Sequence, residues 1–463
     1  MEIVPLTPEY RSAWDNFCLT SPDAWFWHTT AWIDFNLAYR PELQQKSLSF
    51  LYKEGDRILA VVPLLLGCDQ RDGKPYRFFS FCGIPIPAPA LAEGLSAARR
   101  MKLMESIFEL IEGLAQELEV AHSHFRIVPL SPACLKPKYA IYNDLLRYRY
   151  LDCSSATQMI DLRLNEQELW AGVRRDHQRN IVKAREALRI QIHSGDRLTE
   201  AKFDEYRLMH ARAAGRVTRP AETFRMMRDW IRSGDGFIAE ACLADGKSVG
   251  FETFHGYKGS GYSMSACNEP GYGRLPIRHL VQWESILWMK TQGLEFYEVG
   301  PQHFGFSICD FPDQKKRDIS LFKSGFGGVT VPVLQAERFH SRLHWDQEHR
   351  RRTDLFTSGY SWEISANAEQ ARSLLQLLEE TGKPHAPKPE ETELIPESVR
   401  TLAAEAVHAN PDAVQRYRNG STKVVAFLVG TTMQRVSKDV APQFVRRAIE
   451  ELLAQSIAAE KQS

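Results

Sequence analysis

The sequence lacks net charge, a long apolar run and an apolar leader, and each absence excludes a class of protein. Lysine plus arginine and aspartate plus glutamate both total 58, so the formal net charge of +0 excludes a uniformly basic nucleic-acid binder, although basic patches can still exist. The most apolar stretch, Ile58 to Leu66, is far shorter than the roughly 20 residues that span a bilayer. Residues 1–15 are acidic and polar where a signal peptide needs a basic start and an apolar run.

The eight cysteines are scattered along the chain, without a C-x-x-C motif or a pairing rhythm. This distribution is typical of reduced and mostly buried thiols, rather than of a disulfide framework or a zinc site. Together with the missing leader and membrane span, it predicts a cytoplasmic protein with no transmembrane segment and no metal.

Two stretches share a pattern of two strand-forming runs around a glycine-containing turn. Ser47–Gly67 turns at Gly55 and Gly236–Gly256 turns at Gly246, where glycine readily adopts positive φ. Long helical windows lie near them, at Ser96–Glu119 and Pro276–Gln292. The repeated layout favours two α/β domains of one architecture, and the alternative is chance, because such turns are common.

The length of 463 residues is too great for one hydrophobic core and predicts about two to four domains. Residues 382–396 are rich in proline and have no apolar periodicity, which indicates an extended linker. We therefore expect α/β domains at residues 1–155 and 156–380, a linker at 381–396 and a small helical domain at 397–463.

The segment from Asn165 to Ile190 has apolar residues at helical spacing and predicts a helix that buries one stripe. The stripe consists of Trp170, Val173, His177, Ile181, Ala184 and Leu188. Arg175 and Arg179 fall on other faces, where nearby acidic residues do not neutralise them. A solvated basic face is one interpretation, and a site for an anionic ligand is the other.

The last part of the chain has signals for short helices with basic polar faces. Asn410-Pro411 marks a helix start with proline at the first helical position, and Gly420 marks a stop. Basic side chains on such helices can neutralise phosphates and position a nucleic acid without reading its sequence. They are Arg416, Arg418, Lys423, Arg435, Lys438, Arg446 and Arg447.

This tail resembles the C-terminal helical domain shared by the GatB component of the tRNA-dependent amidotransferases and the YqeY proteins. The resemblance is carried by Asn410-Pro411, Tyr417, Gly420, Lys423, Phe427 to Gly430, Met433, Lys438 and Pro442. It departs at Ser437-Lys438-Asp439, where such domains usually carry Lys-Gly. The resemblance implies tRNA, and not DNA, as the partner of these basic residues, and the alternative is a solubilising or protein-docking tail.

The body contains the sequence DISLFKSGFGG at residues 318–328, behind a helix-to-strand segment at residues 275–301. Together they resemble the Fem-type aminoacyltransferases, which are built from tandem GNAT-like domains. The matching residues are Glu298, Gly300, Phe322, Lys323, Gly325, Gly327 and Gly328. Glu298 stands where Asp is more usual, and the long coiled-coil insertion of some members is absent. The resemblance implies an α/β fold with two tandem GNAT-like domains, followed by a small all-helical domain.

Aminoacyl transfer explains why a lysine is needed in this body. When an acceptor amine attacks the ester of aminoacyl-tRNA, negative charge develops on the carbonyl oxygen, and a fixed cation in a partly dry pocket stabilises it. The resemblance implies Lys323 as that cation and Glu298 as a second catalytic residue. The candidates for substrate binding are Arg175, Arg179, Phe322, Gly325 and Gly327.

Proton removal from the acceptor needs a base, which spacing alone does not identify. The candidates are Glu298, Tyr297, Asp310, His303, Asp176 and His177, or the ribose hydroxyl of the substrate itself.

Two further patterns suggest other ligands. His340, His344 and Glu348 are spaced by four residues as metal ligands on a helix can be, but the surrounding arginines disfavour a bound cation and favour a solvated basic helix. Asn268–Pro276 is a weak match to the glycine-rich phosphate cradle of GNAT enzymes that use acetyl-CoA.

We therefore expect an aminoacyltransferase that moves an amino acid from aminoacyl-tRNA to an amine or hydroxyl acceptor, with no cofactor. The alternatives are an N-acyltransferase of GNAT type that depends on acyl-CoA, and a non-catalytic tRNA-binding adaptor. The sequence does not identify the acceptor, for which a cell-wall peptide precursor, an amino sugar and a secondary metabolite are options.

Overall fold

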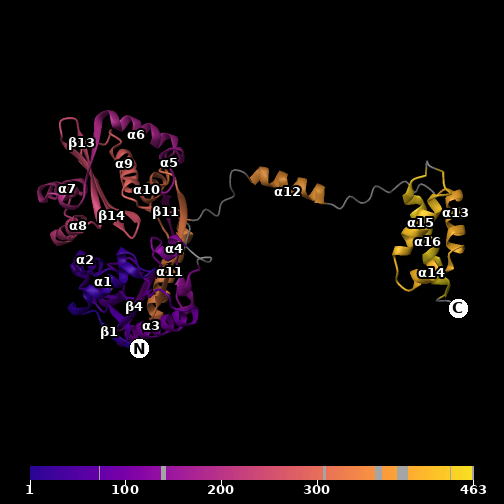
Figure 1. The fold of residues 1–463 in the computed structure, drawn as a ribbon, viewed down its shortest axis with the longest axis horizontal. Helices are drawn as coiled ribbons and strands as arrows, with labels where there is room; N and C mark the ends of the chain where they lie inside the picture. The colour runs from indigo at the N-terminus through magenta and orange to yellow at the C-terminus, as the bar shows by residue number, and fades with distance from the viewer. Residues whose placement is uncertain are drawn as a thin grey trace. The chain divides into compact units, whose positions relative to one another are not determined.

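The computed structural model describes residues 1–71, 73–136, 142–305, 309–359, 368–382, 395–437 and 440–460. The chain forms two compact units, Met1–Ser361 and Trp362–Ser463 (Figure 1). Residues 383–394, which make up most of the predicted linker, lie outside the described residues.

The first part of unit Met1–Ser361 is built on two sheets. One has the strand order β1 (Glu2–Pro5), β3 (Phe50–Glu54), β4 (Arg57–Val62) and β8 (Ala90–Leu91). The other has the order β10 (Leu151–Asp152), β18 (Gln335–Phe339), β9 (Val120–Arg126), β6 (Lys74–Phe79), β5 (Leu65–Arg71) and β2 (Lys46–Ser47), with β7 (Ile86–Pro87) also paired to β9. The helices of this part are α1 (Arg11–Thr20), α2 (Thr30–Tyr39), α3 (Ala97–Glu117) and α4 (Pro132–Leu135).

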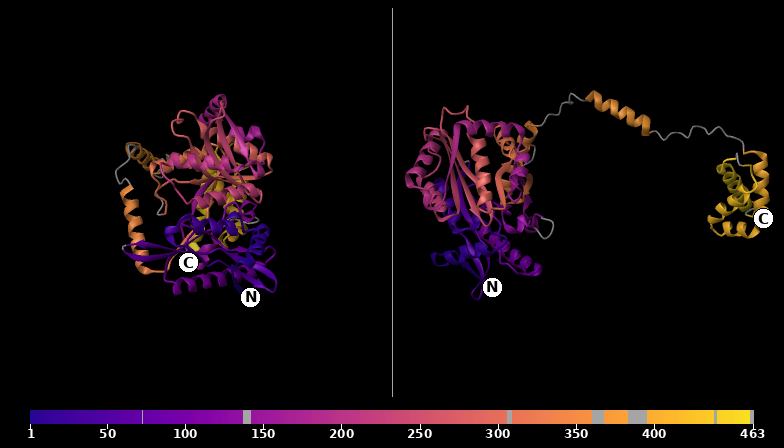
Figure 2. Two further views of the ribbon diagram at one scale, coloured as in Figure 1. Left: turned by 90° about the vertical axis from the view of Figure 1, so that its left-hand side faces the viewer. Right: turned by 45° about the horizontal axis from the view of Figure 1, so that its top comes forward.

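The second part of this unit is a seven-stranded sheet with helices on both faces (Figure 2). Its strand order is β12 (Leu188–His193), β13 (Gly236–Leu243), β14 (Ser248–Tyr257), β15 (Ser260–Asn268), β16 (Phe296–Gln302), β11 (Ser155–Asp161) and β17 (Val329–Val333). Its helices are α5 (Glu166–Gly172), α6 (Arg175–Ala187), α7 (Glu200–Ala214), α8 (Ala221–Ser233), α9 (Ile277–Thr291) and α10 (Gln314–Ser324). Because side chains alternate along a strand, Phe237 and Ala239 pack with α6 and α9, while Ile238 packs with α7 and α8.

Both predicted hairpins are confirmed. In β3–β4, Glu54 pairs with Arg57 across a turn in which Gly55 has φ of +59°. In β13–β14 the turn contains Gly246, with φ of +84°. Glycine adopts these left-handed conformations without the steric cost that a side chain imposes.

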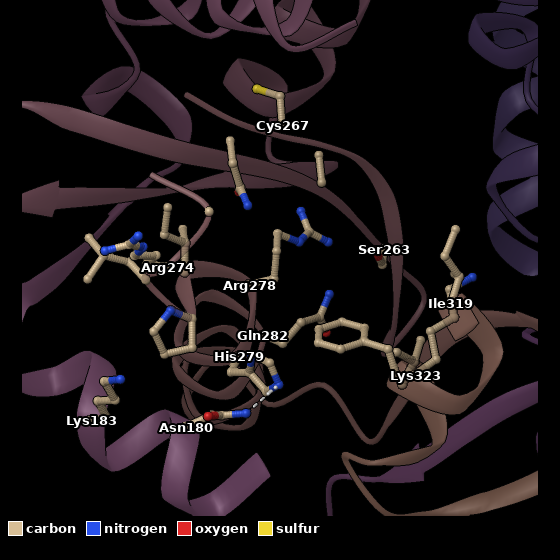
Figure 3. A pocket seen from close by; sticks show the side chains of 18 residues that line it. Asn180, Lys183, Ser263, Cys267, Arg274, Arg278, His279, Gln282, Ile319 and Lys323 are labelled. Carbon is tan, nitrogen blue, oxygen red and sulfur yellow. Dashed lines mark hydrogen bonds between the residues drawn. The ribbon is translucent and has the colours of Figure 1, made fainter. Parts of the chain in front are cut away.

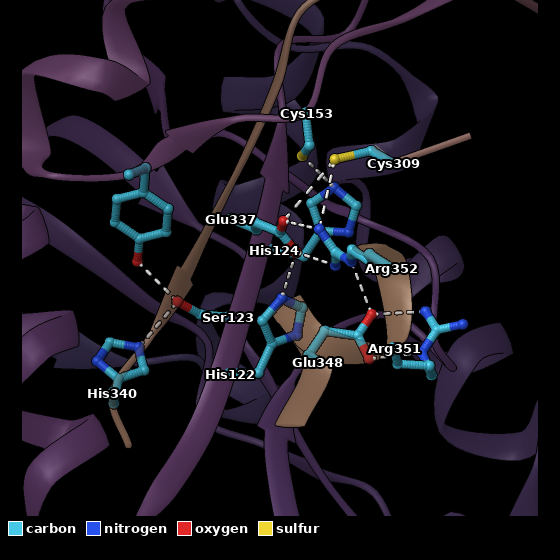
Figure 4. Close-up of polar contacts among 11 residues, drawn as sticks. His122, Ser123, His124, Cys153, Cys309, Glu337, His340, Glu348, Arg351 and Arg352 are labelled. Atoms are coloured by element: carbon cyan, nitrogen blue, oxygen red, sulfur yellow. Dashed lines mark hydrogen bonds and ion pairs between the residues drawn. The ribbon is translucent and has the colours of Figure 1, made fainter. Parts of the chain in front are cut away.

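The chain returns to its first sheet after completing the second. β18 pairs with β9 and β10, and α11 (Arg342–Gly359) follows it, so residues 335–359 differ from their predicted place in the second domain. An ion-pair cluster holds α11 to this sheet: Arg352 pairs with Glu337 and Glu348, and Glu337 lies 2.9 Å from His122 (Figure 4). The prediction that the arginines of this helix are solvated is therefore wrong for Arg352, whose side chain is only 16% exposed.

Polar contacts join the two parts of unit Met1–Ser361. Nζ of Lys258 donates to the backbone carbonyls of Cys18, Ser21 and Ala24 near the end of α1, and burial lowers the pKa of Lys258 to about 8. Nε1 of Trp25 donates to the carbonyl of Tyr257 at 2.9 Å. Because these donors and acceptors are enclosed, the contacts fix one sheet relative to the other.

Unit Trp362–Ser463 contains α12 (Ala368–Gly382), α13 (Glu397–His408), α14 (Pro411–Arg418), α15 (Lys423–Met433) and α16 (Pro442–Glu460). The last four pack around a core that includes Val399, Leu428, Val445, Ile449 and Leu453. The predicted helix start at Pro411 and stop at Gly420 are confirmed. Pro411 is the first residue of α14, and Gly420, two residues after the last residue of α14, has φ of +91°. Among the described helices of the chain, none combines the length and apolar character that a membrane crossing requires.

Candidate functional site

A pocket lies where two neighbouring strands separate. β15 and β16 pair in parallel from Ser260–Phe296 to Tyr262–Glu298, after which both strands continue apart. The pocket beyond this point has a volume of about 620 Å³ and is lined by residues of β15, β16, α6, α9 and α10 (Figure 3). Its lining includes Ser263, Cys267, Arg278, Gln282, Val299, Ile319, Phe322 and Lys323. An opening between splayed strands gives a ligand access to backbone and side chains of both.

Lys323 occupies the last turn of α10. Its Nζ lies 3.5 Å from the carbonyl oxygen of Pro301. Gly300 makes room for this side chain, because a Cβ at that position would lie 2.7 Å from Nζ. Burial lowers the pKa of the Lys323 ammonium, and the carboxylates of Glu298 and Glu252 oppose that shift.

Glu298 is a buried carboxylate on β16 whose charge acts on Lys323. Thr157 of β11 donates a hydrogen bond to its Oε1 at 2.7 Å. Burial raises the pKa of the Glu298 carboxyl, and the Thr157 hydrogen bond together with the charges of Arg126 and Lys323 oppose the rise. Lys323 therefore presents its ammonium group at the pocket wall, while the Glu298 carboxylate is buried inside the protein.

A second buried carboxylate, Glu252 of β14, has no counterpart in the residues selected from the sequence. Ser263 and Gln282 each donate to Oε1 of Glu252 at 2.6 Å, and Arg278 pairs with the same oxygen at 2.9 Å. Tyr297, one of the base candidates, donates its hydroxyl hydrogen to Gln282 at 2.7 Å. Within the described part of the chain, Oε2 of Glu252 and Nη1 of Arg278 are buried without a hydrogen-bond partner. Buried orphan groups of both signs beside a pocket are suited to a polar ligand.

The glycine-rich turn after Lys323 packs against α5 and α6. The N–H of Arg174 donates to the carbonyl of Gly325 at 2.9 Å. Gly327 has φ of +86°, and a Cβ there would lie 2.8 Å from the carbonyl oxygen of Gly172. The glycines therefore permit close packing of two backbones, while their predicted contact with a substrate stays a prediction. The pocket lining contains Phe322 and Lys323 but neither Gly325 nor Gly327.

This packing breaks the helix that the sequence predicted over Asn165–Ile190. α5 ends at Gly172, α6 begins at Arg175, and the turn between them meets the glycines of residues 325–327. The apolar stripe is nevertheless buried from Val173 to Leu188, with Trp170 partly exposed.

His177, another base candidate, is buried under the last turn of α10. Its Nε2 lies 2.9 Å from the carbonyl oxygen of Phe322, and Arg174 approaches its Nδ1 at 3.2 Å. Burial lowers the pKa of the His177 imidazole. With both ring nitrogens occupied, His177 positions α10, and Asp176 is engaged by Arg174 at 2.6 Å.

A row of exposed cations leads along α6 to the pocket. Arg175, Arg179 and Lys183 are spaced by four residues, or about 6 Å of helix rise, on one face. None forms an ion pair with a residue in the described ranges, and Lys183 also lines the pocket. Arg175 and Arg179 lie beside Trp170 on the adjoining surface.

The basic residues of the tail that we expect to bind tRNA differ in whether they already form an ion pair or a hydrogen bond within the protein. Arg416 and Lys423 are exposed and form no ion pair with the residues described. Arg435 pairs with Glu405 at 2.7 Å, and Arg446 lies 3.8 Å from Glu450. Arg418 instead donates to the carbonyl of Ser456 at 3.2 Å, which ties α14 to α16. Lys438 lies outside the described residues.

The two histidines that are spaced like metal ligands, His340 and His344, contact residues of the first part of the body. His340 lies 2.9 Å from the hydroxyl of Ser123 and 3.1 Å from Glu112, while Glu348 is engaged by arginines (Figure 4). Over the residues that the structure describes, there is no group of three His, Cys, Asp or Glu side chains arranged to hold a metal ion.

Comparison with known proteins supports the two resemblances separately. Residues 363–453 match the family model of the GatB domain. The chain is 36% identical over 78 residues to the GatB component of the aspartyl/glutamyl-tRNA(Asn/Gln) amidotransferase of Chlamydia pneumoniae, covering 16% of each chain. It is 32% identical over 87 residues to the same component from Brevibacillus brevis, covering 18% of each. The chain thus matches less than a fifth of the length of these curated relatives.

The body has the fold of FemX. The solved structure of FemX is covered over its entire length by 75% of this chain, at a TM-score of 0.51 and 12% sequence identity. The predicted α/β fold of two tandem GNAT-like domains with a helical C-terminal domain is confirmed. At this identity the likeness concerns the fold, and the chemistry depends on the residues of the pocket.

Proposed function

We propose that this protein is an aminoacyltransferase that moves an amino acid from aminoacyl-tRNA to an amine or hydroxyl acceptor. The observation that carries the proposal is that one chain joins a GatB-type helical domain to a Fem-like body whose pocket contains Lys323. The amidotransferases that share the tail act, by their name, on aspartyl- and glutamyl-tRNA. A tail of that kind is suited to hold the donor while the body performs the transfer.

The pocket supplies the electrostatics that the reaction needs. A tetrahedral intermediate at the ester carbon carries an oxyanion, and Lys323 presents an ammonium group at the pocket wall. The cation row of α6 can contact phosphates, because its basic side chains recur about every 6 Å along one helix face. Trp170 beside Arg175 and Arg179 offers a surface on which an unpaired base can stack.

An acyl-CoA donor is the second candidate, and one observation favours it. The segment Gly273–Arg278, which leads into α9, lines the pocket at the place where a helix start can bind a pyrophosphate. The two donors are separated by one experiment. The protein is incubated with a pool of charged tRNAs and a cell extract, and mass spectrometry then follows consumption of the aminoacyl esters; consumption of acyl-CoA alone contradicts the proposal.

Replacing both Arg175 and Arg179 with alanine should raise KM for aminoacyl-tRNA with little change in melting temperature. The two side chains are exposed and unpaired among the described residues, so their loss removes phosphate contacts without removing packing. The slope of the logarithm of the tRNA-binding constant against the logarithm of the salt concentration should become shallower by roughly 1.4. This value corresponds to about 0.7 for each of two lost single-strand phosphate contacts. Arg185→Ala is the matched control, because Arg185 of the same helix pairs with Glu284. If the melting temperature of the double variant also falls, the two arginines stabilise the fold and are not specific to tRNA binding.

Deleting residues 383–463 should weaken tRNA binding and reduce its salt dependence while unit Met1–Ser361 stays folded, because that unit is compact by itself. Filter binding across a salt series measures both quantities. Within the full chain, the double replacement of Arg416 and Lys423 should reproduce part of the loss, whereas Arg435→Ala should lose less because Glu405 already neutralises Arg435. Unchanged affinity after the deletion would contradict a role of the tail in tRNA binding.

A further inference from the structure

His303 and Asp310 form a hydrogen-bonded pair in the segment that follows β16. Nδ1 of His303 lies 2.9 Å from Oδ1 of Asp310, whose Oδ2 accepts the backbone N–H groups of Phe304 and Gly305 at 3.2 and 3.3 Å. A carboxylate at Nδ1 holds the proton of a neutral imidazole there and leaves the lone pair of Nε2 available. Nε2 has no hydrogen bond to any residue within the described ranges, and the His303 side chain is 32% exposed.

The pair is attached to the helix turn that carries Lys323. The N–H of His303 donates to the hydroxyl of Ser320 at 2.8 Å, and Ser320 is buried on α10. Ser320 and Lys323 are three residues apart and share one helix face. Lys323 in turn contacts the carbonyl of Pro301, two residues before His303. Ser320 and Lys323, on one face of α10, therefore contact the same short stretch of chain, at the backbone of His303 and of Pro301.

The other end of the pair is anchored to the first sheet. Cys309, which precedes Asp310, accepts a hydrogen bond at Sγ from Arg352 at 3.4 Å (Figure 4). Arg352 also pairs with Glu337, whose side chain is 5% exposed. Buried ion pairs of this kind have a narrowly defined geometry. Asp310 thus follows directly after a residue that contacts this cluster, while its own carboxylate binds the segment after β16.

We propose that His303 is the proton-transferring base of the aminoacyl transfer and that Asp310 is its positioning residue. This assignment rests on the proposed function and adds the catalytic group that spacing alone did not identify. An imidazole with a carboxylate at Nδ1 and a free Nε2 is the arrangement that moves protons in acyl transfer on unrelated folds. Of the side chains considered as bases, Tyr297, Asp176, Glu298 and His177 are each engaged in the contacts described above, whereas Nε2 of His303 has no hydrogen-bond partner among the described residues.

The transfer balances without an oxidant or a metal ion. The acceptor ammonium first loses one proton to solvent, and its nitrogen lone pair then attacks the ester carbonyl carbon. As the C–N bond forms, Nε2 of His303 takes a second proton from that nitrogen, and Asp310 stabilises the imidazolium. When the C–O bond to the ribose breaks, the imidazolium returns this proton to the departing ribose oxygen. Lys323 faces the oxyanion throughout, and the net product is an amide, a free tRNA 3′ end and one proton.

A purely structural role for the pair makes a different prediction. Asp310 would then only hold the turn at Phe304 and Gly305, and removal of the imidazole would affect rate, binding and melting together. A proton-transfer role affects the rate of transfer alone and permits chemical rescue, because a small base can enter the space left by the missing ring.

The test uses the full-length protein, a charged tRNA pool as donor and the small-molecule fraction of a cell extract as acceptor. His303→Ala should lower single-turnover transfer by roughly 10²- to 10³-fold, with tRNA affinity and melting temperature near those of the wild type. Added imidazole should restore part of the rate in His303→Ala. Asp310→Asn should lose less, because the imidazole remains but its orientation and charge stabilisation are reduced. His349→Ala, which changes an exposed histidine of α11, is the control and should transfer normally.

The outcomes separate the two proposals. If the wild type consumes no aminoacyl ester, the proposed function fails and the assignment of His303 fails with it. If the wild type transfers and His303→Ala transfers equally well, only the assignment is overturned. A slow His303→Ala that melts lower and is not rescued by imidazole, together with a normal rate for Asp310→Asn, also overturns it. Rescue of a folded His303→Ala variant supports it.

Discussion

Replacing Lys323 with methionine should lower single-turnover transfer from bound aminoacyl-tRNA by roughly 10²-fold or more. Methionine keeps most of the packing of the lysine stem against Gly300 and removes the ammonium group that faces the pocket. In a partly dry site the lost charge is not replaced by water, so the oxyanion loses a fixed partner. The fold should survive, because the Thr157 hydrogen bond and the charge of Arg126 still compensate the buried Glu298 carboxylate.

The measurement is a quenched-flow transfer assay with enzyme in excess, accompanied by filter binding of tRNA. Binding should change far less than the rate, because Arg175 and Arg179, which we expect to contact phosphates, are not among the residues that line the pocket with Lys323. Lys315→Met, at an exposed position in the first turn of the same helix, is the matched control. A near-normal rate for Lys323→Met, or equal losses of rate and binding, would place the oxyanion partner elsewhere.

The sequence was sufficient to predict those hairpins and helix ends whose geometry depends on a few neighbouring residues. The two hairpins followed from glycine at turns that need positive φ, and the start of α14 followed from Asn410-Pro411. The choice of Lys323 as a candidate came from the resemblance of this region to a family, which also indicated the tandem fold that FemX shares. The hairpins and the helix start are readable because each depends on residues that are close together in the chain.

Features that depend on distant contacts were not predictable in the same way. The break before Arg175 is caused by backbone packing against glycines some 150 residues away, which no helical periodicity records. The network around Glu252 joins β14, β15 and α9, so its members look like ordinary core and helix residues in the sequence. Charge alone likewise did not distinguish Arg418, which closes the tail bundle, from the exposed Lys423.

Replacing Gly300 with alanine should reduce both stability and transfer. Gly300 has φ of +122°, a conformation that favours glycine, so alanine should destabilise the fold by about 1–3 kcal/mol. The new methyl group would also lie 2.7 Å from Nζ of Lys323 and push the ammonium away from its present position. We expect transfer to fall by roughly 10-fold or more even at temperatures where the variant is folded, since electrostatic catalysis requires the cation to be placed in advance. Gly113→Ala, at an exposed position of α3 with no atom within 4 Å of the added Cβ, is the control for stability.

A double-variant cycle separates the two effects of Gly300→Ala. In the Lys323→Met background there is no ammonium to displace, so adding Gly300→Ala should change the transfer rate little beyond the loss caused by Lys323→Met alone. Its cost in unfolding free energy, measured with urea, should remain, because the backbone strain at residue 300 does not depend on the side chain at 323. The rates would therefore be strongly non-additive while the stabilities are nearly additive. If the fold-loss in rate of the double variant equals the product of the losses of the two single variants, Gly300 affects the reaction independently of Lys323. Gly300 would then have to contact the substrate directly.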